Sequence, residues 1–135
     1  MNTRMIVTGK QWWGGGADLT PVLDNRRTQT DPDTVDFHAA MKAACDSYDG
    51  ADFTAMRDHC DSYFHLAHRN EPRGTGGIFY DHLECEDLAG FEANLAFTRA
   101  VGEAFLSAFP RIVRRRMDQE WNPDDRQQML EWRGR

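Results

Sequence analysis

The sequence predicts a single α+β unit, with two or three strands flanked by helices. Apolar residues recur at spacings of three and four over 53–67 and again over 91–109, which is typical of amphipathic helices. An aromatic run at 78–80 follows a glycine-dense turn and indicates a strand. The length of 135 residues suffices for a buried core, so residues 1–135 are expected to form one domain.

In the first half of the chain, the pattern predicts a strand, a loop and two helices. Residues 4–9 are predicted to form a short strand, and the Trp-Trp-Gly-Gly-Gly run at 12–16 is predicted to break regular structure. An acidic segment with proline in its first turn predicts a helix over about 31–47. The central amphipathic helix is expected over about 52–69.

In the second half, one strand and three helical pieces are expected. The strand is predicted over 76–83, and a long helix follows over about 88–108 with an apolar stripe suited to core packing. Pro110 should kink or restart this helix, giving a second piece to about Met117. A last helix is expected to begin at Asn122-Pro123.

The charge balance limits the classes of partner. The chain carries 16 basic and 22 acidic residues, and its net charge of −6 argues against non-specific nucleic-acid binding. The one basic cluster, 114–116, has acidic neighbours and is predicted to be a solvated helix face. No apolar run approaches the roughly 18–20 residues of a membrane span. The N-terminus lacks a signal-peptide pattern, although an upstream targeting segment could have been lost if Met1 is internal.

Cysteine usage points to a reducing environment. The three cysteines, Cys45, Cys60 and Cys85, are odd in number and show no C-x-x-C spacing. Free thiols are therefore expected, which favours a cytoplasmic location. Cys45 and Cys60 fall on the apolar faces of predicted helices and are expected to lie in the core.

The densest group of chemically active side chains is His-Arg-Asn-Glu-Pro-Arg at 68–73. Pro72 cannot continue a helix, so this group is expected at a helix C-terminus and in the loop after it. Two arginines suit a carboxylate ligand, because a guanidinium binds a carboxylate through two N–H groups and keeps its charge. The glycines at 74–77 allow close approach to the backbone. From the residues alone, an exposed arginine pair on a solvated face is an equally good interpretation.

Residues 57–81 resemble the signature of oxygen-dependent coproporphyrinogen III oxidases. That signature runs basic-x-Trp-Cys-x-x, three aromatics, x-x-His-Arg-x-Glu-x-Arg-Gly-x-Gly-Gly-x-Phe-Phe-Asp. The departures are Arg57 for Lys, His59 for Trp, Thr75 for an aliphatic residue, Tyr80 for the second Phe, and His82 where a second Asp is common. Upstream, Trp-Trp-Gly-Gly-Gly-Ala-Asp-Leu-Thr-Pro is similar to the family's Trp-Phe-Gly-Gly-Gly-x-Asp-Leu-Thr-Pro, with Trp13 in place of Phe.

The resemblance covers nearly the whole chain but less than half of the family's sequence. The family pattern His-x-Asn-x-Arg is present as Asn2-Thr3-Arg4 after Met1, without the histidine that is proposed as proton donor in relatives. The chain is therefore expected to be an internal fragment or a truncated product from the central part of such an enzyme. A non-catalytic tetrapyrrole-binding or dimer-forming fragment is the alternative function.

The resemblance implies both a fold and a reaction. The family fold is an α-β-α sandwich, with an antiparallel sheet between helical layers. The implied reaction is the oxidative decarboxylation of two propionates of coproporphyrinogen III to vinyl groups, giving protoporphyrinogen IX with O2 as oxidant and without flavin or haem. The full-length enzyme is implied to be a homodimer. The resemblance therefore predicts a site for carboxylates and pyrrole N–H groups.

The same resemblance assigns the candidate site residues. Asp18 is expected to contact the pyrrole N–H groups and to act in catalysis; the alternative is a turn residue bonded to nearby amides. Arg69 and Arg73 are assigned to propionate binding and catalysis, or to ordering the loop through Glu71. The substrate-binding segment of relatives corresponds to Asn2, Thr3 and Arg4, and candidate aromatic walls are Trp12, Trp13, Phe79 and Tyr80.

Two histidines are candidate ligands of a divalent metal. His38 shares a predicted helix face with apolar residues, where a histidine is more often a core residue than a ligand. The resemblance implies that His38 and His68 bind a divalent cation of unknown identity. A metal-assisted hydrolase is a rival function, but no third ligand with suitable spacing is evident in the sequence.

Overall fold

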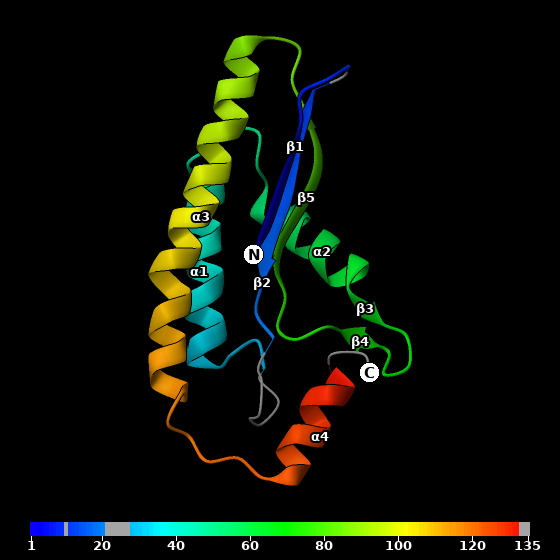
Figure 1. Cartoon of the computed structure of the whole chain (residues 1–135), viewed down its shortest axis with the longest axis vertical. Coiled ribbons are helices and arrows are strands. Elements are labelled where there is room, and N and C mark those ends of the chain that lie inside the picture. Colours follow the sequence, from blue (N-terminus) through cyan, green and yellow to red (C-terminus); the bar gives the residue numbers. More distant parts are fainter. Residues whose placement is uncertain (10, 21–27, 133–135) are drawn as a thin grey trace.

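The computed structural model describes residues 1–9, 11–20 and 28–132. The secondary-structure elements are, in chain order (Figure 1), β1 (Asn2–Ile6), β2 (Trp12–Asp18), α1 (Pro32–Asp46), α2 (Phe53–Tyr63), β3 (His65–Leu66), β4 (Glu71–Pro72), β5 (Gly77–Glu84), α3 (Leu88–Arg116) and α4 (Pro123–Trp132). Among these elements, no helix has the length and apolarity that crossing a bilayer requires.

The main sheet has the strand order β1-β2-β5, with both pairs antiparallel, and it lies between helices (Figure 1). Side chains alternate across it. Tyr80 of β5 packs on Phe97 of α3, whereas the neighbouring Phe79 contacts His59 and Tyr63 of α2. Helices α1 and α3 thus cover one face and α2 covers the other, which confirms the predicted α+β class.

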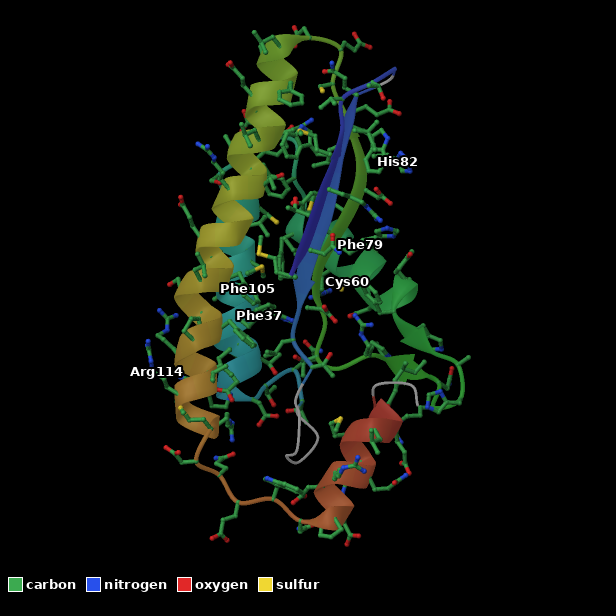
Figure 2. The ribbon with its side chains drawn as sticks, viewed as in Figure 1. Phe37, Cys60, Phe79, His82, Phe105 and Arg114 are labelled. Atoms are coloured by element: carbon green, nitrogen blue, oxygen red, sulfur yellow. The ribbon has the colours of Figure 1, made fainter. Side chains whose placement is uncertain are left out.

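The core lies between the sheet and the α1–α3 pair. Figure 2 places Phe37 on this side of the sheet and Phe79 on the α2 side. Full burial of a large apolar side chain such as phenylalanine contributes about 1.5–3 kcal/mol to the free energy of folding. Cys45 and Cys60 are buried, as predicted. The largest fully buried apolar side chains are Phe37, Met41, Ile78, Phe97 and Val101.

The glycine-rich segment forms the central strand of the sheet, so the predicted loop is wrong. Gly15 and Gly16 have no room for a side chain: a Cβ would lie 2.7 Å from Asn2 O at Gly15 and 2.2 Å from Ile78 O at Gly16. Close approach to both neighbouring strands therefore requires glycine despite its low strand propensity. Strand β1 begins two residues earlier than predicted and ends at Ile6, and all five of its residues are exposed.

The central helix ends at Tyr63 and not near residue 69. The chain instead forms the short hairpin β3–β4, in which His65 pairs with Pro72. Asn70 has a φ of 52°, a left-handed conformation that a helix does not accommodate, and Pro72 lacks the N–H that a helix needs. Residues 68 and 69 therefore lie in a hairpin turn and not at a helix C-terminus.

Helix α3 continues through Pro110, so the predicted restart of the helix at this residue is wrong. Proline costs this helix a hydrogen bond and introduces a steric clash. Apolar side chains before and after the proline offset that cost, because Ala108 and Ile112 pack in the core cluster. Tertiary packing thus outweighs the local preference.

Two of the three arginines at 114–116 form an ion-paired clamp between α1 and α3. Arg115 Nη2 and Arg116 Nε lie 2.7 Å and 2.6 Å from the carboxylate oxygens of Asp33, whose side chain is 5% exposed. Arg115 also contacts Asp36 at 2.9 Å. The predicted solvated face is correct for Arg114, which points away from the sheet (Figure 2), and for Arg115, whose side chain is 45% exposed. Arg116 is only 28% exposed and is partly buried against Asp33.

Candidate functional site

A hollow of about 340 Å³ opens on the α2 face of the sheet, at the ends of β1 and β2. Its polar side chains are those of Asn2, Arg4, Asp18 and Arg73. Its aromatic side chains are those of Tyr63, Phe64 and Phe79. The hollow thus combines two cations, one carboxylate and an aromatic surround.

Arg73 and Asp18 face each other in this hollow. Nη2 and Nε of Arg73 both donate to Asp18 Oδ2, at 2.8 Å and 3.3 Å, and the guanidinium carbon lies 4.0 Å from the centre of the Phe64 ring. Both side chains are partly exposed, at 30% and 23%. The arrangement brings together two of the predicted site residues from positions 55 apart in sequence.

The turn after Arg73 produces this contact. Gly74, with a φ of 63°, lies against the end of β2: a Cβ there would stand 2.4 Å from Leu19 O. The Thr75 N–H donates to Leu19 O at 2.9 Å, and the Leu19 N–H donates to Gly76 O at 2.8 Å. The turn is thereby bonded to the residue that follows Asp18, which brings Arg73 to the Asp18 carboxylate.

At the other end of the hollow, Arg4 pairs with Asp81. Arg4 Nη2 donates to Asp81 Oδ2 at 3.0 Å, and its guanidinium lies 5.9 Å from the Trp12 ring centre. A β-bulge turns Asp81 to this position, because Asp81 and His82 together oppose the single residue Gly14 of β2. His82 has a φ of 52°. Sequence reasoning assigned no role to Asp81, although Asp81 matches the last residue of the family's Phe-Phe-Asp ending.

The segment Asn2-Thr3-Arg4 divides between the two faces of the sheet. Asn2 and Arg4 are two residues apart on β1 and both line the hollow. Thr3 points to the opposite face, where its hydroxyl lies 3.5 Å from Gly14 O and near Tyr80. Two of the three predicted contacts therefore share the hollow, and Thr3 does not.

The predicted aromatic walls are also only partly in place. Phe79 lines the hollow, and His59 stacks on it with ring centres 5.0 Å apart. Trp13 and Tyr80 are buried on the opposite face against α3, so they are not walls. Tyr63, 62% exposed and 4.5 Å from Phe79, takes part instead and was missed by sequence reasoning. Successive side chains of a strand point to opposite faces, so Phe79 faces the hollow and its neighbour Tyr80 does not.

Arg69 lies outside the hollow, in the β3–β4 turn. Its Nε donates to Glu71 and its Nη1 donates to Glu131 Oε2 of α4 at 3.1 Å. These contacts support the alternative in which Arg69 orders the loop. Its assignment to propionate binding and catalysis stays a prediction.

Comparison with known proteins identifies the family. The sequence profile described as Coproporphyrinogen III oxidase matches residues 1–135. The chain belongs to this family. It is 47% identical over 134 residues to the oxygen-dependent coproporphyrinogen-III oxidase of Rickettsia africae (strain ESF-5), covering 99% of this chain and 45% of the relative. The oxidases of Rickettsia rickettsii (strain Sheila Smith) and Rickettsia akari (strain Hartford) are 46% identical over the same shares. The chain thus spans less than half the length of these relatives.

The two histidines for which the family resemblance implies a metal lie in separate surroundings. His68 Nε2 is 3.1 Å from Glu131 O of α4. His38, on α1, is 6.1 Å from the Phe53 ring, and its Nε2 is buried without a hydrogen-bond partner among the described residues. Burial lowers the pKa of His38, which favours the neutral ring. No group of three or more His, Cys, Asp or Glu side chains able to hold a metal occurs in the described part of the chain. The two histidines thus have different neighbours among the described residues, and their assignment to a divalent metal stays a prediction.

Three acidic groups that are at least partly buried have raised pKa values: Cys60 and Asp61 on α2, and Cys45 on α1 in the core on the other face of the sheet. Burial raises the pKa of Cys60 to about 12 and that of Cys45 to about 11, so both thiols stay protonated and unreactive. Burial also raises the pKa of Asp61. No cysteine lines the hollow among the residues that the structure describes.

A larger hollow of about 570 Å³ lies near the loop between β5 and α3. Its lining includes Glu84, Glu86 and Asp87, and no arginine among the described residues. An acidic lining repels carboxylates, so this hollow does not suit the ligand class that the family name indicates. The smaller hollow at Arg4 and Arg73 is the better candidate site.

Proposed function

We propose that the hollow at Arg4, Asp18 and Arg73 is part of a coproporphyrinogen III oxidase site and receives the tetrapyrrole substrate. The observation that carries the proposal is the meeting of Asp18 and Arg73 in one hollow with Arg4. A tetrapyrrole with propionate arms requires cations at its rim and an acceptor for its N–H groups. The names of the relatives supply the substrate class.

Each residue has a proposed role. Arg4 and Arg73 bind propionates, because a guanidinium offers paired N–H donors to a carboxylate. Asp18 accepts hydrogen bonds from the pyrrole N–H groups and draws electron density into the ring, which helps the ring to react with O2. Phe79 and Tyr63 provide apolar contact for the macrocycle. Arg73 thus binds substrate and also orients Asp18.

The proposed reaction converts two propionate arms to vinyl groups. Each arm loses one CO2 and gives up two electrons, and O2 accepts the four electrons and is reduced to water. Neither flavin nor haem has a role in this proposal. A fragment that binds the tetrapyrrole without turnover is the second candidate, because the chain spans 45% of the length of its relatives.

A homodimer, a divalent cation and a cytoplasmic location also belong to the proposal. The three free cysteines are compatible with a reducing compartment. Light scattering measures the oligomeric state, elemental analysis after a metal titration measures bound cation, and cell fractionation measures location. Strong stoichiometric zinc would favour the metal-assisted hydrolase.

A chimaera tests the activity. Residues 1–135 replace the matching segment of the Rickettsia africae enzyme, and conversion of coproporphyrinogen III is followed under air and under nitrogen. We expect conversion with CO2 release under air, and neither under nitrogen. A folded chimaera that binds the tetrapyrrole and yields no CO2 in air would favour the non-catalytic alternative.

Asp18→Ala in this chimaera tests the catalytic role. Loss of the carboxylate should lower turnover by at least about a hundredfold, while substrate affinity is largely kept. Asp58→Ala is the matched control, since Asp58 is exposed on α2 and does not line the hollow. Near-normal turnover in Asp18→Ala would remove Asp18 from the mechanism.

A further inference from the structure

The Arg4 corner of the hollow is built around the carboxylate of Asp81. Oδ2 of Asp81 accepts from Arg4 Nη2 at 3.0 Å, and Oδ1 accepts from the His82 N–H at 3.1 Å. Gly14 lies beneath the pair, where a Cβ would stand 2.6 Å from Asp81 Oδ1 and 3.1 Å from Arg4 Nε. The ion pair therefore depends on the absence of a side chain at position 14.

The two arginines of the hollow are held with different strength. Arg73 places two N–H groups on Asp18 and stacks on Phe64, and its side chain is 30% exposed. Arg4 makes one hydrogen bond to its carboxylate, and its side chain is 48% exposed. A guanidinium binds a carboxylate best through two parallel N–H groups. Arg4 thus keeps more donor capacity for an incoming carboxylate than Arg73 does.

We propose that Asp81 occupies the place of a ligand carboxylate at Arg4, so that a propionate arm binds there by exchange with Asp81. The proposal rests on the proposed function in taking a propionate-bearing tetrapyrrole as the ligand. Asp81 acts through Arg4 and is therefore a positioning residue. It holds the guanidinium beside Trp12 before the ligand arrives and sets how strongly this corner attracts carboxylates.

Exchange has a consequence for specificity. Asp81 neutralises Arg4, so a second carboxylate meets both the attraction of the guanidinium and the repulsion of Asp81. A ligand with one carboxylate gains little at such a corner. A ligand with several arms is held elsewhere, by Arg73, and its next arm competes with Asp81 at a high effective concentration. The corner therefore favours ligands that carry several carboxylates.

Asp81→Asn tests the exchange, because asparagine keeps the acceptor for the His82 N–H and removes the charge. The dissociation constant of coproporphyrin III, measured by fluorescence titration of the 135-residue chain, should fall about threefold to tenfold. The tetramethyl ester of the same porphyrin should show no such gain. Asp58→Asn, which changes the net charge equally but lies on the outer side of α2 paired with Arg57, should leave the constant within about twofold.

A purely structural role for Asp81 would move these readouts in the opposite direction. Weaker coproporphyrin binding in Asp81→Asn, with an unchanged urea midpoint, would overturn the exchange. In the Arg4→Gln background the gain should vanish, since the exchange requires the guanidinium. Asp81→Ser provides a second neutral variant if Asp81→Asn does not fold.

A titration with free propionate distinguishes the exchange at Arg4 from the proposed function. The Nε–Hε NMR signal of Arg4, assigned by its loss in Arg4→Gln, should shift at lower propionate concentration in Asp81→Asn than in the unmodified chain. If this holds and coproporphyrin III does not bind, the exchange stands and the proposed function fails. If coproporphyrin III binds and Asp81→Asn changes neither titration, the exchange fails and the proposed function stands.

Discussion

The hollow and the α1–α3 clamp use the same pair of residue types, arginine and aspartate, in different surroundings. In the clamp, Asp33 is 5% exposed and two arginines surround it. In the hollow, Asp18 and Arg73 form a pair in which both side chains remain partly exposed. The clamp joins two helices, whereas the pair in the hollow faces open space beside aromatic rings.

The difference teaches that burial decides what an arginine–aspartate pair does. A buried carboxylate is costly to leave unpaired, so the clamp should contribute to stability when it is intact and destabilise the fold when it is broken. A partly exposed pair contributes little to stability, since water screens it. Its groups remain accessible to a ligand. Variants of the two regions should therefore separate stability from binding.

The largest effect is expected in the clamp. Asp33→Ala removes the buried partner of Arg115 and Arg116, and the free energy of unfolding should fall by about 2–3 kcal/mol, because the arginines themselves can reach water. Urea unfolding measures it. Asp46→Ala, which breaks an exposed pair with Lys42, should cost no more than about 0.5 kcal/mol. Equal losses in the two variants would contradict the role of burial.

Arg73→Lys should have the next largest effect, on binding. Lysine keeps the charge and loses the paired N–H groups, so coproporphyrin III should bind about tenfold more weakly while the free energy of unfolding changes by less than about 1 kcal/mol. Fluorescence titration and urea unfolding measure the two quantities. Arg111→Lys on the exposed side of α3 is the matched control and should change neither. An unchanged dissociation constant would remove Arg73 from carboxylate binding.

A smaller effect is expected at the hairpin. Glu131→Gln weakens the contact between α4 and Arg69, so α4 amides should exchange with solvent faster and stability should fall by about 1 kcal/mol or less. Coproporphyrin binding should stay within about twofold, with exposed Glu120→Gln as the control. A large change in binding would instead link Arg69 to the ligand, as first predicted.

The smallest effect concerns Asp61, whose pKa is raised by burial. Its Oδ1 is buried without a hydrogen-bond partner among the described residues. Because the folded state binds this proton more tightly, Asp61 lowers stability as pH rises above its unfolded pKa and through its folded pKa. Asp61→Asn should therefore raise the free energy of unfolding by at most about 1 kcal/mol at pH 7.

This gain should fade toward pH 4, where the carboxyl group of Asp61 becomes protonated in the unfolded chain as well. Urea unfolding at the two pH values measures it. Asp58→Asn, on the exposed surface, should show no such trend. A gain that is independent of pH would mean that packing, and not the charge of Asp61, is responsible.

Local patterns predicted much of the fold but not its contacts. Helix α1 and strand β5 follow from a proline-led acidic start and an aromatic run, which are local signals. The central strand β2 was missed because glycine disfavours strands locally, whereas close approach to β1 and β5 requires it here. Pro110 likewise misled the local prediction, since packing in the core holds α3 together.

The site shows the same division. Asp18 and Arg73 were predicted from the family signature, and the structure brings them together. Asp81 matched the same signature but was given no role, because its contact with Arg4 depends on a bulge and on a partner 77 residues away. Arg69 and Arg73 lie four residues apart in one motif, yet the hairpin turns them to different neighbours.

The exposed strand β1 has a consequence for ligand affinity. It lies at the margin of the sheet and carries Asn2 and Arg4, half of the polar side chains of the hollow. Strands with little burial detach transiently, and a ligand that needs the docked strand binds in proportion to the docked population. For the proposed tetrapyrrole ligand, part of the binding free energy would then go into ordering this strand. Whatever covers β1 from outside would tighten binding without touching the ligand.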